Sequence, residues 1–337
     1  MIREAIAKVV DGADLSADEV SQTMDEIMGG DATPAQIAGF ITALRMKGET
    51  VLEVTGAAAS MRHHATFIDA GARSVVDTCG TGGDRSNTFN ISTATAFVTA
   101  GAGVCVAKHG NRAVSSQCGS ADVLDALGVN LDADPFVMEQ CLQENGIAFL
   151  FAPRMHPAMK YAIGPRRELG IRTIFNMLGP LTNPAGATGQ VLGVFAPELT
   201  EMFAHVLREL GCRRAYVVHG LDGLDEITCT DATRVTELRD GDVKTSELLP
   251  EMLVGHTYDP DALAGGIPEK NAGILKNVLS GEAGGPRDVV LLNAAAAIVA
   301  GEKADRLEEG LELARDSIDS GAALAKLETL IEATADA

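Results

Sequence analysis

The fold is decided by residues 74–101, SVVDTCGTGGDRSNTFNISTATAFVTAG, in which an apolar run meets a glycine-rich loop and then an apolar helical stretch. Ser74–Thr78 is typical of a buried strand, and Ala94–Ala100 is typical of a helix. The strand pattern recurs, with helical stretches in most of the gaps, at Val104–Lys108, Ile147–Phe151, Gln190–Phe195 and Ala215–His219. This alternation predicts an α/β domain with a mostly parallel central sheet covered by helices.

The first 65 residues predict a small all-helical domain. They contain three capping boxes, which begin at Ser16, Thr33 and Thr50, and glycines at 29–30 and 48 that would end helices. Helices this short must pack on each other, on the larger domain or on a second subunit. The end of the chain predicts further helices at Asn271–Leu279, Asp288–Ala300 and Arg306–Ala333, the last broken near Gly321. We therefore expect a helical domain over 1–65 and an α/β domain over 66–337.

The composition excludes several classes of partner. Lys and Arg number 27 against 47 Asp and Glu, so the formal net charge is −20. A field of that sign repels nucleic acid and anionic membranes, and a phosphate site must therefore be built locally from backbone N–H groups, a few cations and a metal. The six cysteines form no CxxC pair, and the chain shows neither a signal peptide nor an apolar run long enough to span a bilayer. These features predict a cytoplasmic protein without nucleic-acid or membrane partners.

The loop Gly80-Thr81-Gly82-Gly83-Asp84 follows the first predicted strand directly. Its glycines permit positive φ angles, which expose N–H groups as an anion-binding nest. The spacing matches neither the Rossmann nor the Walker fingerprint, and a tight structural turn would explain the loop equally well. However, Asn90-Ile91-Ser92-Thr93 opens the next helix, where N–H groups and the helix dipole also favour anions. We interpret the two together as a phosphate site, although polar residues at a helix start often serve only as caps.

Two more polar segments follow predicted strands. Residues 108–116, KHGNRAVSS, predict a flexible loop with two permanent cations, and Ser120 lies at the start of the next helix. Asp225-Glu226 follows the strand that ends at His219. Adjacent carboxylates are suited to Mg²⁺ that remains partly hydrated and bridges to phosphate oxygens, although an acidic pair in so acidic a chain is usually a solvated surface. In parallel sheets ligands bind beyond the carboxyl ends of the strands, so we expect these segments to meet at one edge.

Together these segments resemble the anthranilate phosphoribosyltransferase family, whose members join 5-phosphoribosyl 1-pyrophosphate to anthranilate in tryptophan synthesis. The resemblance covers essentially the whole chain, with the motifs in the family's order and spacing. The matching segments are Gly80–Asp84, Asn90–Thr93, Lys108–Arg112, Leu169–Asn176 with Leu178–Pro184, and Asp225-Glu226. No position that the resemblance assigns to donor, metal or acceptor departs from the family pattern.

The resemblance implies a homodimer formed through the helical domain, which helices from about 157–180 would join. It assigns the phosphoribosyl donor to Gly80, Gly83, Asp84, Thr88, Asn90, Ile91, Ser92, Thr93, Lys108, His109, Gly110, Asn111, Arg112, Ala113, Val114, Ser115, Ser116 and Ser120. It assigns anthranilate to Gly80, Asn111 and Arg166. Two Mg²⁺ ions per subunit are implied, one held by Ser92 and Glu226 and the other by Asp225 and Glu226.

The mechanism implied is displacement of pyrophosphate by the aromatic amine, with inversion, and no general base is required because the amine is already neutral. His109 is a candidate for taking the proton after attack, and it is equally interpretable as a loop hydrogen-bonding residue. Two alternatives stay open. A pyrimidine-nucleoside phosphorylase shares the architecture but lacks the Lys-His-Gly-Asn-Arg loop, and a non-catalytic nucleic-acid-binding relative would need a basic groove and eroded carboxylates at 225–226.

Overall fold

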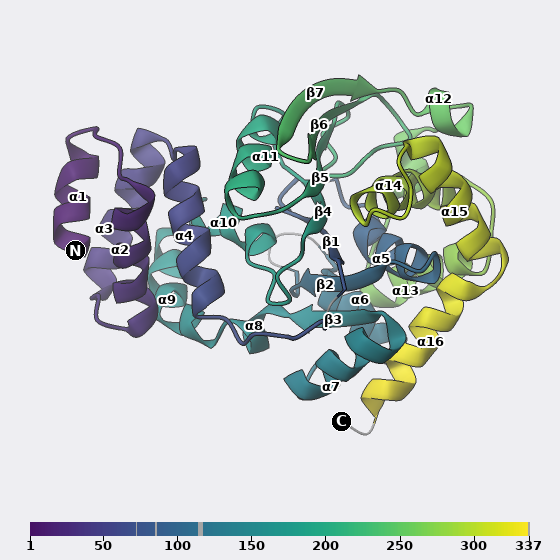
Figure 1. Cartoon of the computed structure of the whole chain (residues 1–337), viewed down its shortest axis with the longest axis horizontal. Coiled ribbons are helices and arrows are strands. Elements are labelled where there is room, and N and C mark those ends of the chain that lie inside the picture. Colours follow the sequence, from purple (N-terminus) through teal and green to yellow (C-terminus); the bar gives the residue numbers. More distant parts are fainter. Residues whose placement is uncertain (72, 85, 114–116, 336–337) are drawn as a thin grey trace.

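A helical bundle stands beside an α/β domain in the computed structural model, which describes residues 1–71, 73–84, 86–113 and 117–335. Figure 1 shows the bundle at one end of the long axis, the sheet in the middle and the C-terminal helices at the other end. This arrangement matches the predicted fold class. No helix in these described ranges is both long enough and apolar enough to cross a lipid bilayer.

The sheet of the α/β domain has the order β3-β2-β1-β4-β5-β6-β7 in the described part of the chain. Its strands are β1 (Val75–Gly80), β2 (Cys105–Gly110), β3 (Ile147–Phe151), β4 (Gly189–Gly193), β5 (Arg214–Gly220), β6 (Thr233–Arg239) and β7 (Asp242–Leu248). The first five run parallel, whereas β6 and β7 are antiparallel additions at one edge. The five predicted strands are thus confirmed within a few residues, and the sequence analysis missed β6 and β7.

Helices cover both faces of the sheet. One group of helices comes from two parts of the chain. Residues 91–140 supply α5 (Ile91–Gly101), α6 (Ser120–Leu127) and α7 (Pro135–Gln140), and the C-terminal part supplies α13 (Pro268–Leu279), α14 (Gly285–Ala300), α15 (Leu307–Asp319) and α16 (Ala322–Ala335). Helix α11 (Leu199–Glu209) packs on β5 and β6 from the side of the bundle. The break at Gly321, which lies between α15 and α16, confirms the predicted interruption.

The N-terminal bundle consists of α1 (Ile2–Val10), α2 (Ala17–Gly29), α3 (Pro34–Lys47) and α4 (Val51–His63). All three predicted capping boxes form: the Ser16, Thr33 and Thr50 side chains each accept from a backbone N–H in the first turn, and the partner side chain returns the bond. Helix α9 (Lys160–Leu169) packs on α2 and α3. The bundle core is continuous with the apolar layer between α11 and the sheet, so the bundle is fixed against that face.

Short helices complete the structure where the chain passes between these layers. They are α8 (Ala152–Met155), α10 (Phe175–Leu178) and α12 (Glu251–Val254), with a π-helical turn at Cys141–Asn145 and 3₁₀ turns at Pro157–Met159, Gly179–Leu181 and Pro260–Leu263. All six cysteine side chains are buried, as expected for small hydrophobic residues.

Candidate functional site

The glycine-rich loop continues β1 at the carboxyl edge of the sheet. Gly82 and Gly83 have φ angles of 65° and 81°, the left-handed conformation that glycine adopts without strain. Thr81 anchors the start of the loop, because its N–H donates to the Gly193 carbonyl at 2.8 Å and its hydroxyl accepts from the Phe195 N–H at 3.0 Å. The loop therefore presents backbone N–H groups beyond the sheet, as an anion nest requires.

The Asp225 carboxylate lies against this loop. Its Oδ2 accepts a hydrogen bond from the Gly82 N–H at 2.8 Å. Only glycines leave room for this approach: a Cβ on Gly80 would lie 2.5 Å from Asp225 Oδ2, and a Cβ on Gly193 would lie 1.5 Å from the Asp225 carbonyl oxygen. The loop after β5 and the loop after β1 thus meet, although 143 positions separate Gly82 from Asp225.

The N-terminus of α5 lies against the second carboxylate. The Ser92 N–H donates to Glu226 Oε1 at 3.1 Å, and the Lys108 ammonium donates to the Ser92 hydroxyl at 3.3 Å and to the Thr78 carbonyl. A helix N-terminus favours a carboxylate through its unpaired N–H groups and its dipole. The segments that follow β1 and β5 therefore converge at one edge of the sheet, together with Lys108 of β2.

The electrostatics of this cluster disfavour the charged forms of its carboxylates in the absence of a cation. Burial raises the pKa of Glu226 to about 8, with Lys108 opposing the shift and Asp84 adding to it. Burial, followed by the Asp84 and Glu226 carboxylates, raises the pKa of Asp225 well above its ordinary value. Burial also lowers the pKa of Lys108, although Asp77 and Glu226 act in the opposite direction. Carboxylates crowded in this way would be relieved by a divalent cation.

The metal ligands at this edge suit a magnesium ion that is only partly coordinated by protein side chains. No group of three or more His, Cys, Asp and Glu side chains in the described ranges could hold a metal ion alone. Mg²⁺ ordinarily takes one or two carboxylates and completes its octahedron with water and substrate phosphates. The two carboxylates at 225–226, with the Ser92 hydroxyl nearby, match that requirement.

The segment from Lys108 onward differs from its prediction as a loop. Lys108, His109 and Gly110 belong to β2 and pair with Phe149, Leu150 and Phe151 of β3. Lys108 and His109 are both buried, Lys108 on the face that α5 covers, where it contacts Ser92, and His109 on the opposite face, against Gly179 and His156. The prediction that the loop begins at Lys108 was therefore wrong, and irregular chain begins only after Gly110. The two cations accordingly differ, one buried and one exposed.

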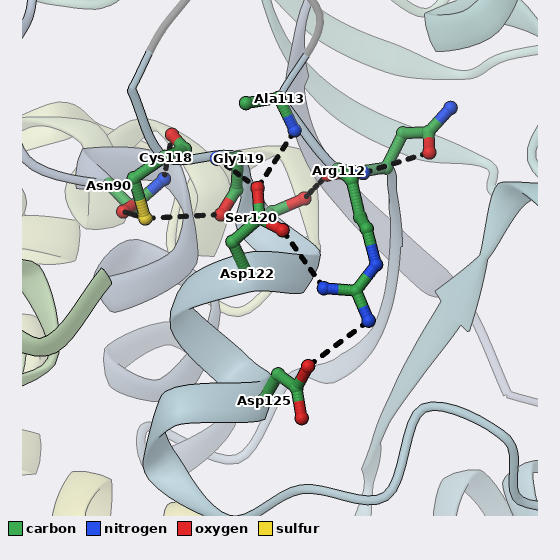
Figure 2. A network of polar contacts seen from close by, with 9 residues as sticks. Asn90, Arg112, Ala113, Cys118, Gly119, Ser120, Asp122 and Asp125 are labelled. Atoms are coloured by element: carbon green, nitrogen blue, oxygen red, sulfur yellow. Dashed lines mark hydrogen bonds and ion pairs between the residues drawn. The ribbon is translucent and has the colours of Figure 1, made fainter. Parts of the chain in front are cut away.

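Figure 2 shows how the chain is fastened after β2. The Arg112 guanidinium donates to Asp122 at 2.9 Å and to Asp125 at 3.0 Å, both on α6. The Asp122 carboxylate also accepts from the N–H groups of Ala113 at 2.8 Å and Gly119 at 2.9 Å. Arg112 is thus paired within the protein, and its predicted contact with the donor stays a prediction.

The side chains assigned to the acceptor come from separate elements. Arg166, on α9, lies 5.1 Å from the centre of the Phe175 ring, and burial lowers its pKa. Asn111 is exposed, with its Oδ1 accepting from the Arg112 N–H at 2.8 Å. His109 Nδ1 lies 3.2 Å from the Gly179 carbonyl oxygen, and burial lowers the His109 pKa to about 3, so the ring is neutral at pH 7.

The remaining predicted donor residues are held in different ways. Thr88 forms an isolated bridge with Ala264, and Ile91 and Thr93 are buried in α5. Asn90 is the N-cap residue of α5, but its side chain makes no capping hydrogen bond: its amide donates to the Cys118 carbonyl at 3.1 Å, as Figure 2 shows. The Ser120 hydroxyl donates to the Asn111 carbonyl at 3.2 Å. The predictions for Val114, Ser115 and Ser116 lie outside the described residues.

Sequence reasoning missed two groups next to this edge. Asp77 is fully buried within β1, where its carboxylate accepts from the His109 N–H at 3.1 Å and from the Asn183 amide at 2.8 Å. Arg172 donates to the Gly83 carbonyl at 2.7 Å. An acidic residue inside an apolar strand was a readable signal for Asp77, whereas Arg172 lies in the matching segment Leu169–Asn176 but was given no role there.

Comparison with known proteins covers both parts of the chain. Residues 72–324 match the model of the glycosyl transferase family, a/b domain, and residues 3–65 match the glycosyl transferase family, helical bundle domain. The chain is 58% identical over 335 residues to an anthranilate phosphoribosyltransferase of Desulfosudis oleivorans, with 99% of each chain covered.

Solved structures of anthranilate phosphoribosyltransferases are similar to this chain over nearly its whole length. The anthranilate phosphoribosyltransferase of Thermus thermophilus superposes with a TM-score of 0.93 at 43% identity, covering 98% of this chain and 99% of that one. The Saccharomyces cerevisiae enzyme, solved in complex with PRPP and Mg, superposes with a TM-score of 0.89 at 29% identity, covering 100% of this chain and 98% of that one.

Proposed function

The chain belongs to the anthranilate phosphoribosyltransferase family, and from this we infer its reaction. The enzyme transfers the phosphoribosyl group of 5-phosphoribosyl 1-pyrophosphate to the amine of anthranilate. The products are N-(5-phosphoribosyl)anthranilate and pyrophosphate, in tryptophan biosynthesis. The observation that carries this conclusion is the convergence of the glycine loop, the α5 N-terminus and the carboxylates at 225–226 at one edge of the sheet.

The donor's phosphates are assigned to the backbone N–H groups of this edge. Gly82 and Gly83 give the glycine loop its turn, Thr93 lies in the first turn of α5, and Lys108 supplies a buried positive charge. The N–H groups of Gly82 and Ser92 already donate to Asp225 and Glu226, which holds the two carboxylates beside the donor. Such a set suits a polyanion in a protein of net charge −20, because every favourable group acts at short range. The Thr88, Asn90 and Ser120 contacts are part of the same proposal.

Magnesium would be held by Ser92, Asp225 and Glu226. When bound, it would neutralise charge on the pyrophosphate as that group leaves. The crowded carboxylates support this assignment, and the yeast relative was solved with Mg. We propose two ions per subunit, one shared by Ser92 and Glu226 and one by the two carboxylates.

Catalysis by the chain's own residues rests on orientation and preorganised charge. Negative charge grows on the pyrophosphate as its bond to the anomeric carbon breaks, and N–H groups already fixed in direction stabilise it without reorganisation. The amine attacks from the opposite face, so the product is inverted. Holding the amine against the anomeric carbon supplies much of the remaining acceleration.

Anthranilate is assigned to Gly80, Asn111 and Arg166. A planar guanidinium matches a carboxylate with two parallel hydrogen bonds, which suits the acid group of anthranilate. His109 is kept as a candidate for taking the amine proton after attack because of its position, whereas burial lowers its pKa to about 3 and makes the ring a weak base. Replacing Arg166 with Ala is expected to raise the KM for anthranilate while leaving the KM for the donor near its original value.

The assembly is proposed to be a cytoplasmic homodimer through the helical domain. Residues 1–65 together with about 157–180 would form that domain, and the rest of 66–337 would form the donor-binding domain. The packing of α9 on α2 and α3 supports this division, and exposed apolar side chains on the bundle, such as Met46 and Leu52, support a partner surface there.

The decisive experiment follows the loss of anthranilate fluorescence after addition of 5-phosphoribosyl 1-pyrophosphate, with and without MgCl₂. We expect turnover that needs both the donor and magnesium. Phosphate-dependent release of thymine from thymidine, in place of that signal, would instead identify a nucleoside phosphorylase. An absence of both activities in the folded protein would contradict the proposed reaction.

A further inference from the structure

We propose that Asn293 is a positioning residue for the carboxylate pair at 225–226, acting through the backbone of Ile227. The inference rests on the proposed function, which assigns that pair to magnesium. Asn293 lies on α14, outside every motif that defines the site, and its helix packs behind the sheet rather than at the substrate edge.

Asn293 is chemically out of place in its helix. The other residues from Val289 to Ala300 are Val, Leu, Ile or Ala, and all of this stretch is buried. The Asn293 side chain has no solvent exposure. A buried amide destabilises the fold unless its polar atoms find partners, so its presence points to a specific bonding role.

The partners of Asn293 are the two backbone groups of Ile227. The Ile227 N–H donates to Asn293 Oδ1 at 3.0 Å, and Asn293 Nδ2 donates to the Ile227 carbonyl at 2.7 Å. The same Nδ2 donates to the Val289 carbonyl at 2.8 Å, which fixes the rotamer. Ile227 belongs to no helix or strand, so the Asn293 amide supplies the hydrogen-bond partners that a neighbouring strand would otherwise give to its backbone.

Ile227 directly follows Glu226, so its backbone position sets where both carboxylates emerge. On the other side, Asp225 presses against Gly193, where any Cβ would collide with its carbonyl oxygen. The dipeptide is thus held between α14 and β4. Both carboxylates then reach N–H groups of the site, Gly82 for Asp225 and Ser92 for Glu226. Loss of the Asn293 bonds would free the backbone without touching substrate or metal.

The competing explanation is a purely structural amide that ties a loop to a helix. Under that explanation, replacing Asn293 lowers stability and nothing else. A positioning role predicts a second effect. Replacing Asn293 should raise the magnesium concentration needed for donor binding, whereas an equally destabilising substitution elsewhere in α14 should not. Ile298 offers the matched control, because it is fully buried in the same helix, more than one turn further along.

The experiment compares Asn293→Leu, Asn293→Ser and Ile298→Ala with the wild-type enzyme. Calorimetry of 5-phosphoribosyl 1-pyrophosphate binding at increasing MgCl₂ gives the magnesium concentration for half-maximal binding, and thermal unfolding gives the melting temperature. We expect Asn293→Leu to raise that concentration at least tenfold, while Ile298→Ala, with a comparable loss of melting temperature, stays within twofold. Asn293→Ser serves if the leucine variant does not fold.

A second measurement needs neither donor nor metal. Amide hydrogen exchange at Ile227 and Thr228 should become faster in the Asn293 variants and stay unchanged in Ile298→Ala. An unchanged magnesium requirement in the Asn293 variants, or an equal shift in Ile298→Ala, would overturn the inference. Wild-type protein that binds no donor at any magnesium concentration would instead refute the proposed function.

Discussion

Arg172 donates a hydrogen bond of 2.7 Å to the main-chain carbonyl of Gly83, while its guanidinium lies 4.2 Å from the centre of the Phe195 ring. The arginine comes from the segment after α9, and the glycine belongs to the loop after β1. Stacking on Phe195 fixes the plane of the guanidinium, so the bond to Gly83 has a defined direction. The glycine loop is thereby fastened to the helical side of the molecule.

Replacing Arg172 with Met should therefore loosen the loop. Because Arg172 is exposed, we expect a moderate effect: a rise of roughly three- to tenfold in the KM for the donor, equivalent to about 1 kcal/mol. Arg172→Lys should restore little, because an ammonium lacks the planar fork. Steady-state kinetics will measure this. Arg167→Met removes the same charge from an exposed position nearby, and an equal effect there would attribute the change to net charge alone.

A second prediction concerns the fastening of the chain after β2 shown in Figure 2. Asp122 accepts from the N–H groups of Ala113 and Gly119 as well as from Arg112, and these bonds lower its pKa although burial opposes the shift. Gly119 is required here because a Cβ would lie 2.4 Å from the Ala113 nitrogen. The carboxylate thus joins two points of the chain that follow β2.

Asp122→Ala should release both points and raise the KM for the donor about tenfold or more, with a smaller effect on the KM for anthranilate. Asp125→Asn is the matched control, because it loses only one bond to Arg112 and leaves both N–H groups held. Kinetics on the pair will separate the explanations. An equal rise in the donor KM in both variants would mean that the ion pair with Arg112, and not the bonds to the two N–H groups, sets the affinity for the donor.

The sequence predicted the centre of the fold and the location of the site for one physical reason. Parallel strands buried on both faces are read as continuous apolar runs, and their carboxyl ends meet at one edge. Strands β6 and β7 escaped because each contains only two apolar residues, and in Asp242–Leu248 every residue is at least partly exposed. The placement of Asp225 and Glu226 beside Gly82 and Ser92 followed from topology alone.

The supporting contacts could not be predicted, because each joins residues far apart in the chain. Asn293 reaches Ile227 from helix α14, and Arg172 reaches Gly83 from the segment after α9. Sequence periodicity reports which face of an element is buried and not which neighbour covers it. The same limit explains Lys108, which was predicted to open a flexible loop, because its pairing with Phe149 of β3 joins residues far apart in the chain.

A third prediction separates the function of Asp225 from the stability of the protein. Its carboxylate is buried beside Asp84 and Glu226, so without metal its charge destabilises the fold. Asp225→Asn keeps an oxygen for the Gly82 N–H while removing that charge. We expect this variant to be more stable than the wild type in EDTA, by about 1–2 kcal/mol, and to lose magnesium-dependent turnover.

Thermal unfolding in EDTA, and then with MgCl₂ and donor, will test both parts. Ligands that bind only the folded state should raise the wild-type midpoint and leave that of Asp225→Asn almost unchanged. Asp222→Asn is the control from the same loop. Its carboxylate is held by the Thr228 and Thr230 hydroxyls, so neutralising it should lower stability. A destabilised Asp225→Asn would refute the charge argument.

The last prediction concerns His156, which is 6% exposed and whose ring lies 5.0 Å from that of His109. Burial lowers the pKa of His156 to about 4, with a hydrogen bond to the Thr182 backbone opposing the shift. In the unfolded chain the imidazole has its ordinary pKa of about 6.5. Between these values the unfolded state binds a proton that the folded state does not, so acid favours unfolding.

The free energy of unfolding should therefore decrease as the pH falls from about 6.5 to about 4, and this histidine should cease to contribute to the slope below that range. Between pH 7 and pH 5 its share is about 2 kcal/mol. Denaturant titrations of the wild type and His156→Gln at both pH values measure it. The variant is expected to lose about 2 kcal/mol less on acidification, whatever its stability at pH 7. Equal losses in the two proteins would show that His156 titrates normally in the folded state.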